Sequence, residues 1–264
     1  MSTRSRYERE LSIARSIAKE AGQLIASRWD TPISIQHKGT IDLVSEIDLA
    51  SEALIIDRIR TSFPDDHICA EESSLDLHGL SVGRVWCIDP LDGTTNFSHG
   101  FPHFCVSIAL LIDGAPVVAV VYDPLRQWSF FATRGGGAWR NDQPLQVTQQ
   151  TQLSQALIAT GFPYDRRESP LNNFDQATRA LLQIQGLRRA GAAALDLAYV
   201  AAGWLDGYWE FKLKPWDVAA GGLLVTEAGG LLSDERGTQE WLKRGIVVCA
   251  GTSTLHQSLC GLVQ

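Results

Sequence analysis

The sequence has no surplus of basic residues and no hydrophobic run long enough to cross a membrane. Its 264 residues include 23 Lys and Arg against 30 Asp and Glu, a formal net charge of −7. Nucleic-acid-binding proteins usually show a basic footprint, so the composition gives that class no global support. The longest apolar stretch, residues 106–121, is interrupted by Asp113, well short of the roughly 20 residues that a bilayer requires. We therefore predict no membrane span.

Cysteine is sparse and unpatterned. The five cysteines form no C-x-x-C pair and their number is odd, which predicts free thiols in a reducing compartment. Residues 1–19 carry charges of both signs and no continuous apolar block, unlike a secretory signal. We therefore expect a cytoplasmic protein.

Several common functional motifs are also missing. There is no P-loop, no G-x-S-x-G and no G-x-G-x-x-G, which removes the usual NTPase, esterase and dinucleotide-binding interpretations. His99 and His103, near Cys105, suggest a zinc site, but Pro102 breaks a helix between them and no further His/Cys pair completes four ligands. We do not predict zinc.

The pattern of apolar residues predicts a layered α/β protein. Amphipathic helices are expected at residues 8–29 and 47–62, and a meander follows in which Asp113-Gly114 joins two strands. From about residue 155, strands at 156–160, 205–211 and 246–250 alternate with helices at 173–184, 192–202, 218–228 and 252–262. We expect a single compact domain over residues 1–264, with an α+β part at about 1–145 and an α/β part at about 146–264.

The most informative segment is D-P-L-D-G-T-T-N-F, residues 89–97. Asp89 and Asp92 follow a predicted strand at residues 84–88, and two carboxylates at this spacing can converge on one hard cation. Gly93 permits a close turn, and a helical turn starting at Thr94 and Thr95 would offer backbone N–H groups to a phosphate oxygen. Taken alone, D-x-x-D-G is a weak signal, and a strand that ends in an Asp-Gly turn with Thr as N-cap is the more common interpretation.

Three further acidic segments have ordinary interpretations of their own. Glu71-Glu72 follows a predicted strand at residues 67–70, as many exposed doublets do. Asp217, in P-W-D-V-A-A-G, fits the start of a helix. Asp48 closes K-G-T-I-D-L-V-S-E-I-D, residues 38–48, where it could cap the second helix.

In combination, these segments strongly resemble the inositol monophosphatase family, and particularly its bacterial branch. Their order and approximate spacing both fit, and the resemblance runs from the first helix to the last. Residues 187–203 also look like the substrate-side segment of the family. The resemblance implies an αβαβα sandwich, often assembled as a homodimer, and a Mg²⁺-dependent phosphomonoesterase similar to bacterial inositol-1-monophosphatases.

The resemblance also implies roles for individual residues. Glu71, Asp89 and the Leu91 carbonyl would hold one Mg²⁺; Asp89, Asp92 and Asp217 would hold a second; Glu71 would contribute to a third, weaker ion. Paired divalent cations can both activate a water and stabilise a leaving oxygen.

The remaining implied roles concern water, phosphate and substrate. Asp48 and Thr94, with Glu71, would activate the attacking water. Lys38 would lie on a loop covering the site. Glu72 would lie behind the residues that contact the ions and support them. Glu210 would accept a hydrogen bond from a substrate hydroxyl. Further substrate or phosphate contacts would come from Asp92, Gly93, Thr94, Thr95, Gly191, Ala192, Ala193 and Asp217.

The function therefore has one leading and two alternative interpretations. The leading one is hydrolysis of myo-inositol monophosphate or a similar small polyol phosphate. A second is a related phosphatase for fructose 1,6-bisphosphate, histidinol phosphate or adenosine 3',5'-bisphosphate. Sulfonucleotide and histidinol-phosphate relatives commonly carry Lys after D-G-T, where Thr95 stands here, which favours the inositol branch. A third is a regulatory protein that binds RNA or the transcription machinery, as some bacterial relatives do.

Overall fold

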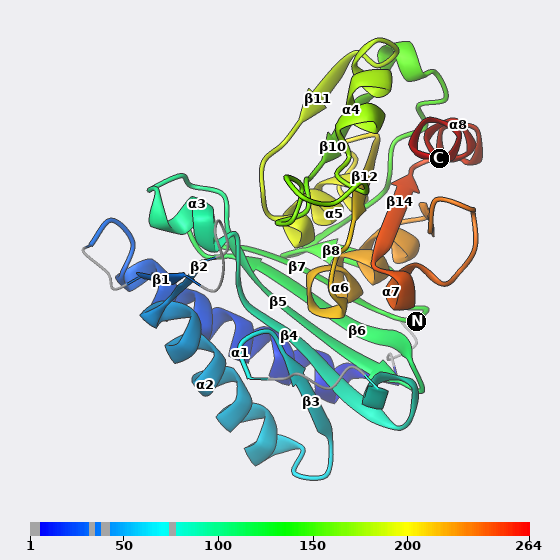
Figure 1. Ribbon diagram of the computed structural model, residues 1–264. Coiled ribbons are helices and arrows are strands. Elements are labelled where there is room, and N and C mark those ends of the chain that lie inside the picture. Colours follow the sequence, from blue (N-terminus) through cyan, green and yellow to red (C-terminus); the bar gives the residue numbers. More distant parts are fainter. Residues whose placement is uncertain (1–5, 32–34, 38–42, 74–77) are drawn as a thin grey trace.

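The computed structural model describes residues 6–31, 35–37, 43–73 and 78–264. Lys38 and Asp42 lie outside the described residues. Helices and sheets alternate in five layers (Figure 1). The predicted αβαβα sandwich is confirmed by this layering.

A seven-stranded sheet forms the second layer. Its spatial order follows the chain from β3 to β9, with β3 and β4 parallel and the other neighbours antiparallel. Asp113 and Gly114 join two of its strands with φ angles of 49° and 77°, as a tight hairpin with both central residues left-handed requires. The strands are β3 (His67–Ala70), β4 (Arg84–Asp92), β5 (Cys105–Ile112), β6 (Ala115–Asp123), β7 (Trp128–Thr133), β8 (Ala138–Arg140) and β9 (Gln143–Pro144).

Helices α1 (Glu8–Ser27) and α2 (Glu46–Ser62) cover one face of this sheet (Figure 1). The small and β-branched residues of α1 recur at helical spacing and are fully buried, which explains the helix and its position. The predicted helix at 8–29 is confirmed to within two residues. A two-stranded ribbon of β1 (Ile35–His37) and β2 (Leu43–Ser45) precedes α2.

The fourth layer is a five-stranded sheet in the order β11-β10-β12-β14-β13. Strand β10 runs parallel to β11 and β12, while β14 is antiparallel to β12 and β13. Helices α5 and α6 lie between the sheets, and α4 and α8 cover the outer face. The elements are β10 (Leu157–Thr160), α4 (Phe174–Leu181), β11 (Gly186–Arg188), α5 (Ala193–Ala201), β12 (Gly207–Phe211), α6 (Pro215–Glu227), β13 (Leu231–Ser233), β14 (Ile246–Ala250) and α8 (Ser253–Val263).

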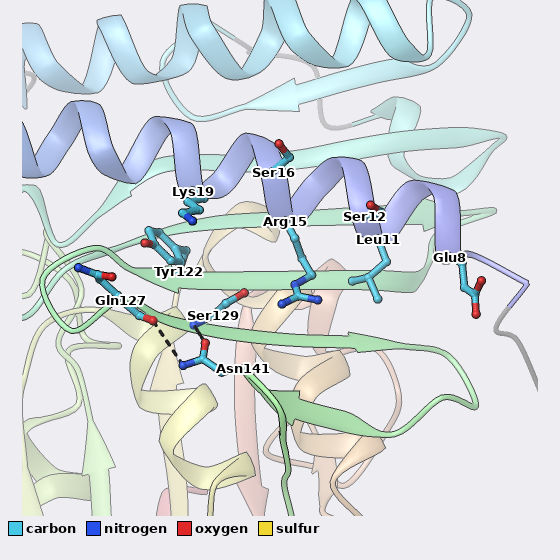
Figure 2. Close-up of a pocket in the computed structure, with 10 residues that line it drawn as sticks. All are labelled: Glu8, Leu11, Ser12, Arg15, Ser16, Lys19, Tyr122, Gln127, Ser129 and Asn141. Carbon is cyan, nitrogen blue, oxygen red and sulfur yellow. Dashed lines mark hydrogen bonds between the residues drawn. The ribbon is translucent and has the colours of Figure 1, made fainter. Parts of the chain in front are cut away.

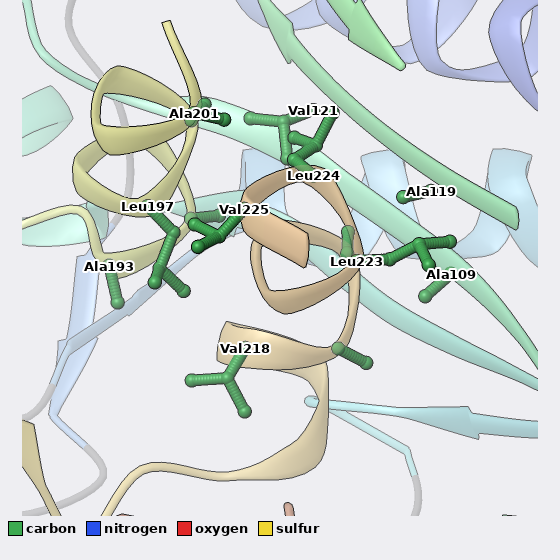
Figure 3. Packing of buried hydrophobic residues seen from close by; sticks show 14 of the residues in the cluster. Ala109, Ala119, Val121, Ala193, Leu197, Ala201, Val218, Leu223, Leu224 and Val225 are labelled. Atoms are coloured by element: carbon green, nitrogen blue, oxygen red, sulfur yellow. The ribbon is translucent and has the colours of Figure 1, made fainter. Parts of the chain in front are cut away.

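The central core is built from small side chains on α5 and α6 that face the seven-stranded sheet (Figure 3). A Cβ added to Gly221 of α6 would stand 2.5 Å from the Cβ of Leu197 on α5, so only glycine lets the two helices approach this closely. This close approach packs α5 and α6 together between the two sheets. Two short helices, α3 (Thr94–Ser98) and α7 (Trp241–Arg244), complete the described elements together with 3₁₀ turns at His78–Ser81 and Leu153–Gln155.

Two further expectations concern membranes and thiols. No helix in the described parts of the chain combines the length and apolarity that a bilayer span needs. None of the five cysteines forms a disulfide, as predicted, and all five are buried. They are Cys69, Cys87, Cys105, Cys249 and Cys260.

Candidate functional site

A cavity of about 400 Å³ brings together the chemically informative segments of the sequence. We call it the acidic cavity. Strand ends and helix starts far apart in the chain form its walls: the end of β4, the start of α3, the end of β12 and the start of α6. The predicted site residues that line it are Glu71, Asp89, Leu91, Asp92, Gly93, Thr94, Gly191, Ala193, Glu210 and Asp217.

The sequence predicts a strand that ends at residue 88, but β4 continues through Asp92. Asp89 pairs with Ser107 of β5 and Asp92 with Cys105, so two residues of β4 oppose one of β5 and form a bulge. Bulges re-aim side chains, and this one sits between the two carboxylates. Ser51 fixes it by donating a hydrogen bond to the Pro90 carbonyl over 2.9 Å.

The two carboxylates of the bulge are held by backbone donors. The Leu91 N–H donates to Asp89 Oδ1 over 3.0 Å. The Ala194 N–H, in the first turn of α5, donates to Asp92 Oδ2 over 2.7 Å, where a helix N-terminus favours negative charge. The remaining carboxylate oxygens are therefore available to the cavity.

Asp48 acts on the cavity through Thr94. It is fully buried and does not itself line the cavity. The Thr94 hydroxyl donates to Asp48 Oδ1 over 2.7 Å, and Asp48 Oδ2 accepts from the Ser45 N–H over 2.8 Å. Asp48 does take part in the cap of α2, as the N3 residue of a capping box whose N-cap is Ser45.

Glu210 and Asp217 form the opposite wall. Asp217, in the first turn of α6, accepts from the Lys214 N–H over 2.7 Å. Glu210 Oε2 accepts from the Tyr208 hydroxyl over 2.5 Å. A Cβ on Gly161 would stand 2.1 Å from the Glu210 carboxylate, so a larger residue there would force that carboxylate to move.

A buried asparagine fixes the loop that carries Gly161. Asn173 Nδ2 donates to the Gly161 carbonyl over 2.6 Å, and its Oδ1 accepts from Trp209 Nε1 over 2.7 Å. Asn173 is completely buried, so these bonds are shielded from water. They tie the loop to β12 next to Glu210.

The acidic cavity is electrostatically unfavourable without cations. Burial and the neighbouring carboxylates Glu71, Asp92 and Asp217 raise the pKa of Asp89 well above its usual range. Burial raises the pKa of Asp92 to about 7 and that of Asp217 to about 8, with further contributions from nearby acidic groups. Burial also raises the pKa of Glu210 to about 7 against the effects of Tyr208 and Arg189.

The donor set fits a hard divalent cation. The cavity offers carboxylate oxygens and the Leu91 carbonyl, which are ligands typical of Mg²⁺ and not of zinc. Within the described ranges, no three His, Cys, Asp or Glu side chains are already closed around a metal position. A bound cation would offset the repulsion among the carboxylates that the raised pKa values reflect.

Some predicted residues lie outside the cavity wall. Thr95 is exposed on α3, and Ala192 is buried at the start of α5. The Glu72 N–H donates to Glu52 Oε2 over 2.8 Å, behind Glu71. Lys38 falls among the residues that the structure does not describe.

The structure also adds residues that the sequence patterns did not indicate. Arg189 lines the cavity and acts on Glu210 and on Asp196, a buried carboxylate of α5. Within residues 187–203, which resemble the family's substrate side, nothing singles out Arg189, and Gly161 and Tyr208 carry no motif. Only the fold brings these side chains to Glu210.

Comparisons with known proteins agree with this site. The model of the inositol monophosphatase family matches residues 6–264. The chain belongs to the inositol monophosphatase family. It is 46% identical over 260 residues to the Nus factor SuhB of Pseudomonas aeruginosa, covering 96% of this chain and 95% of that protein.

Two further relatives are named as inositol monophosphatases. The inositol-1-monophosphatase of Synechocystis sp. is 44% identical over 250 residues, covering 94% of this chain and 86% of that protein. The structure of inositol monophosphatase from Anabaena (Nostoc) sp. superposes with a TM-score of 0.88 at 40% identity, covering 98% of this chain and 96% of the other. The family is one of phosphatases that generally depend on metal ions.

The raised pKa values predict how stability depends on pH in the absence of metal. Between about pH 4 and these raised values, the folded chain keeps protons on carboxyl groups that are already ionised in the unfolded chain. The contribution of these groups to stability is therefore full below about pH 4 and is lost as the pH rises through about 7 and 8. After allowance for solvent screening of Asp217, a loss of about 2 kcal/mol would lower Tm by roughly 5 °C.

Thermal melts in chelator between pH 5 and 9 check this prediction. We expect Asp92→Asn to flatten the slope, and added Mg²⁺ to stabilise the wild type most at the alkaline end. A Tm that rises with pH across this window in chelator would contradict the electrostatic description of the cavity.

Proposed function

We propose that the protein is a Mg²⁺-dependent phosphomonoesterase that hydrolyses myo-inositol monophosphate or a similar small polyol phosphate. The observation that carries the proposal is the convergence of Glu71, Asp89, Asp92 and Asp217 on one cavity beside Thr94. The name of the Synechocystis relative supports the choice of substrate. We further propose that it acts as a cytoplasmic homodimer.

The carboxylates divide into two ligand sets. Glu71, Asp89 and the Leu91 carbonyl would hold one Mg²⁺, and Asp89, Asp92 and Asp217 a second, with Glu71 also contributing to a third, weaker site. When bound, the ions lower the pKa of a water molecule and take charge from the leaving oxygen. The bulge of β4 supports this division because it presents Asp89 and Asp92 on either side of Leu91.

Thr94 and Asp48 would position the attacking water. The Thr94 hydroxyl donates its hydrogen to Asp48 in a 2.7 Å hydrogen bond, so a lone pair of the Thr94 oxygen can accept a hydrogen bond from a water in the cavity. Glu71 would join them in activating it. The backbone at Gly93, Thr94 and Thr95 would face the phosphate.

The polyol would bind on the β12 side of the cavity. Glu210, held by Tyr208, would accept a hydrogen bond from a substrate hydroxyl, and Gly191, Ala192 and Ala193 would form the adjacent wall. Arg189 acts electrostatically on Glu210 and favours its ionised, accepting form. This arrangement separates recognition of the alcohol from the acidic ligands of the reaction centre.

Phosphate release with and without divalent cations tests the activity. We expect turnover of inositol 1-phosphate with Mg²⁺, loss of essentially all activity in excess chelator, and recovery when Mg²⁺ is restored. A panel that includes fructose 1,6-bisphosphate, histidinol phosphate and adenosine 3',5'-bisphosphate would identify a different substrate. Full activity in chelator would refute the metal-dependent mechanism.

Lithium provides a narrower test of the same proposal. Lithium is similar in size to Mg²⁺ but carries half the charge, so it can occupy a cation site without supporting turnover. We expect millimolar lithium to inhibit phosphate release. Resistance would question the subfamily and leave the phosphatase assignment standing.

A second candidate function is a role in transcription. Relatives with 43–46% identity from several bacteria carry the name Nus factor SuhB. The presence of the acidic cavity does not conflict with such a role, because a protein can carry a catalytic cavity on one face and a binding surface on another. Capture of RNA polymerase by the purified, tagged protein from defined components would support it, and no capture at micromolar concentration would count against it.

A further inference from the structure

A second cavity, of about 590 Å³, lies between α1 and the strands β7 and β8 (Figure 2). Because α1 covers the face of the seven-stranded sheet opposite α5 and α6, this cavity is separate from the acidic cavity. The two share none of their described lining residues. We call it the α1 cavity.

Arg15 is the central cation of the α1 cavity. Its guanidinium lies 3.9 Å from the centre of the Phe131 ring, an arrangement that holds the planar group in place. Figure 2 shows it pointing from α1 toward the strand that carries Ser129. Among the described residues, no side chain or carbonyl accepts a hydrogen bond from it. Its N–H donors therefore remain available to a ligand.

The charges around Arg15 are of both signs. Burial lowers the pKa of Arg15, and the electrostatic effect of Asp142 opposes this only in part. Lys19 lies one helical turn further along α1 and also lines the cavity. Glu8 lies at the far end of the same helix face. The described lining thus has two cations, Arg15 and Lys19, against one carboxylate, Glu8, with Asp142 close enough to act on Arg15.

The opposite wall is polar and fixed by hydrogen bonds. The Asn141 side chain accepts from the Ser129 N–H over 2.9 Å and donates to the Gln127 carbonyl over 3.5 Å (Figure 2). Gln127 and Asn141 adopt φ angles of 54° and 53°, a left-handed conformation that is uncommon for Gln. The hydrogen bonds maintain this backbone and keep polar side chains on the cavity wall.

We propose that the α1 cavity binds a small hydroxylated anion. Arg15 and Lys19 hold its phosphate or carboxylate group, and Ser129 and Gln127 hydrogen-bond to neighbouring hydroxyls. A guanidinium matches two oxygens of either anion with parallel N–H donors. The cavity is open to solvent and bounded by a helix on one side and strands on the other, and its volume of about 590 Å³ is within the range of small-molecule sites.

Binding measurements in chelator test the proposal without interference from the acidic cavity, whose carboxylates repel anions when no cation is present. Isothermal titration at low salt would use glycerol 3-phosphate and glycerate, with inorganic phosphate and glycerol for comparison. The first two probes distinguish a phosphate from a carboxylate ligand. We expect saturable binding of one or both, and weaker binding of phosphate and glycerol alone.

Variants locate the binding. We expect Arg15→Gln and Lys19→Gln each to weaken binding about tenfold, as loss of a charge-assisted hydrogen bond implies. Ser129→Ala should weaken glycerol 3-phosphate more than inorganic phosphate. Arg60→Gln, on the exposed surface of α2, removes the same charge outside the cavity and should leave affinity unchanged. Lys19 is exposed, so its replacement leaves the packing intact even if Arg15→Gln disturbs α1.

Three outcomes would overturn the proposal. They are absence of saturable binding by both hydroxylated anions, equal affinity in wild type and Lys19→Gln, and Arg15-dependent binding of homopolymeric RNA without binding of the small anions. Phosphatase activity of the variants, measured separately with Mg²⁺, distinguishes failure of this proposal from failure of the proposed function.

Discussion

Asp92→Asn and Asp217→Asn should each abolish Mg²⁺-dependent turnover while leaving the fold intact. Either substitution keeps an oxygen that can accept the backbone hydrogen bond from Ala194 or Lys214, so local structure is preserved. Each removes one negative ligand from the proposed cation site, and loss of cation stabilisation of several kcal/mol corresponds to about a thousandfold or more in rate. Phosphate release at saturating Mg²⁺ measures the effect.

The same variants should show the opposite effect on stability without metal. Removing one charge relieves repulsion among the remaining carboxylates, so Tm in chelator should rise while activity is lost. Asp175→Asn is the matched control, because Asp175 is exposed in the first turn of α4 and outside the acidic cavity. Near-wild-type turnover in either cavity variant would contradict the proposed ligand set, as would an equal loss in the control.

The sequence alone predicted the elements whose determinants are local. The apolar periodicity of residues 8–27 defines α1, and Asp113-Gly114 defines a hairpin because both positions tolerate positive φ. The order of the acidic segments indicated the family. These features are encoded within a few residues of each other and need no knowledge of the tertiary structure.

The bulge in β4 could not be predicted in this way. Pro90 and the Asp-Gly pair that follows it suggest that the strand ends, yet β4 continues because β5 supplies partners on both sides of the bulge. Ser51, 39 residues away, completes it. A pairing partner elsewhere in the chain outweighs the local turn signal.

The helix predicted at residues 173–184 shows a second kind of limit. The observed α4 covers only Phe174–Leu181, after Asn173 with a φ of 72°. The Asn173 side chain is used instead to join Gly161 and Trp209. The hydrogen bonds of Asn173, and the position of Gly161 against Glu210 that results from them, join segments that no sequence pattern connects.

Glu210→Gln should separate recognition of the polyol from the chemistry of phosphate release. Burial raises the pKa of Glu210 to about 7, while Arg189 and the Tyr208 hydroxyl favour its ionised form. Ionised Glu only accepts hydrogen bonds, whereas Gln presents a mixed donor and acceptor face. A lost charge-assisted hydrogen bond is worth roughly 1.5–3 kcal/mol, so kcat/KM for inositol 1-phosphate should fall about tenfold or more.

An aryl phosphate distinguishes this role from a structural one, because it offers no hydroxyl to Glu210. With this substrate the loss in Glu210→Gln should be much smaller. Tyr208→Phe removes the hydroxyl that orients Glu210 over 2.5 Å without changing the charge of the carboxylate, and should cause a smaller but equally substrate-dependent loss. Equal losses on both substrates would instead mean that Glu210 serves cation binding or the stability of the fold. No loss on either substrate would mean that the polyol does not contact Glu210, since a buried acceptor left without its donor has a measurable energetic penalty.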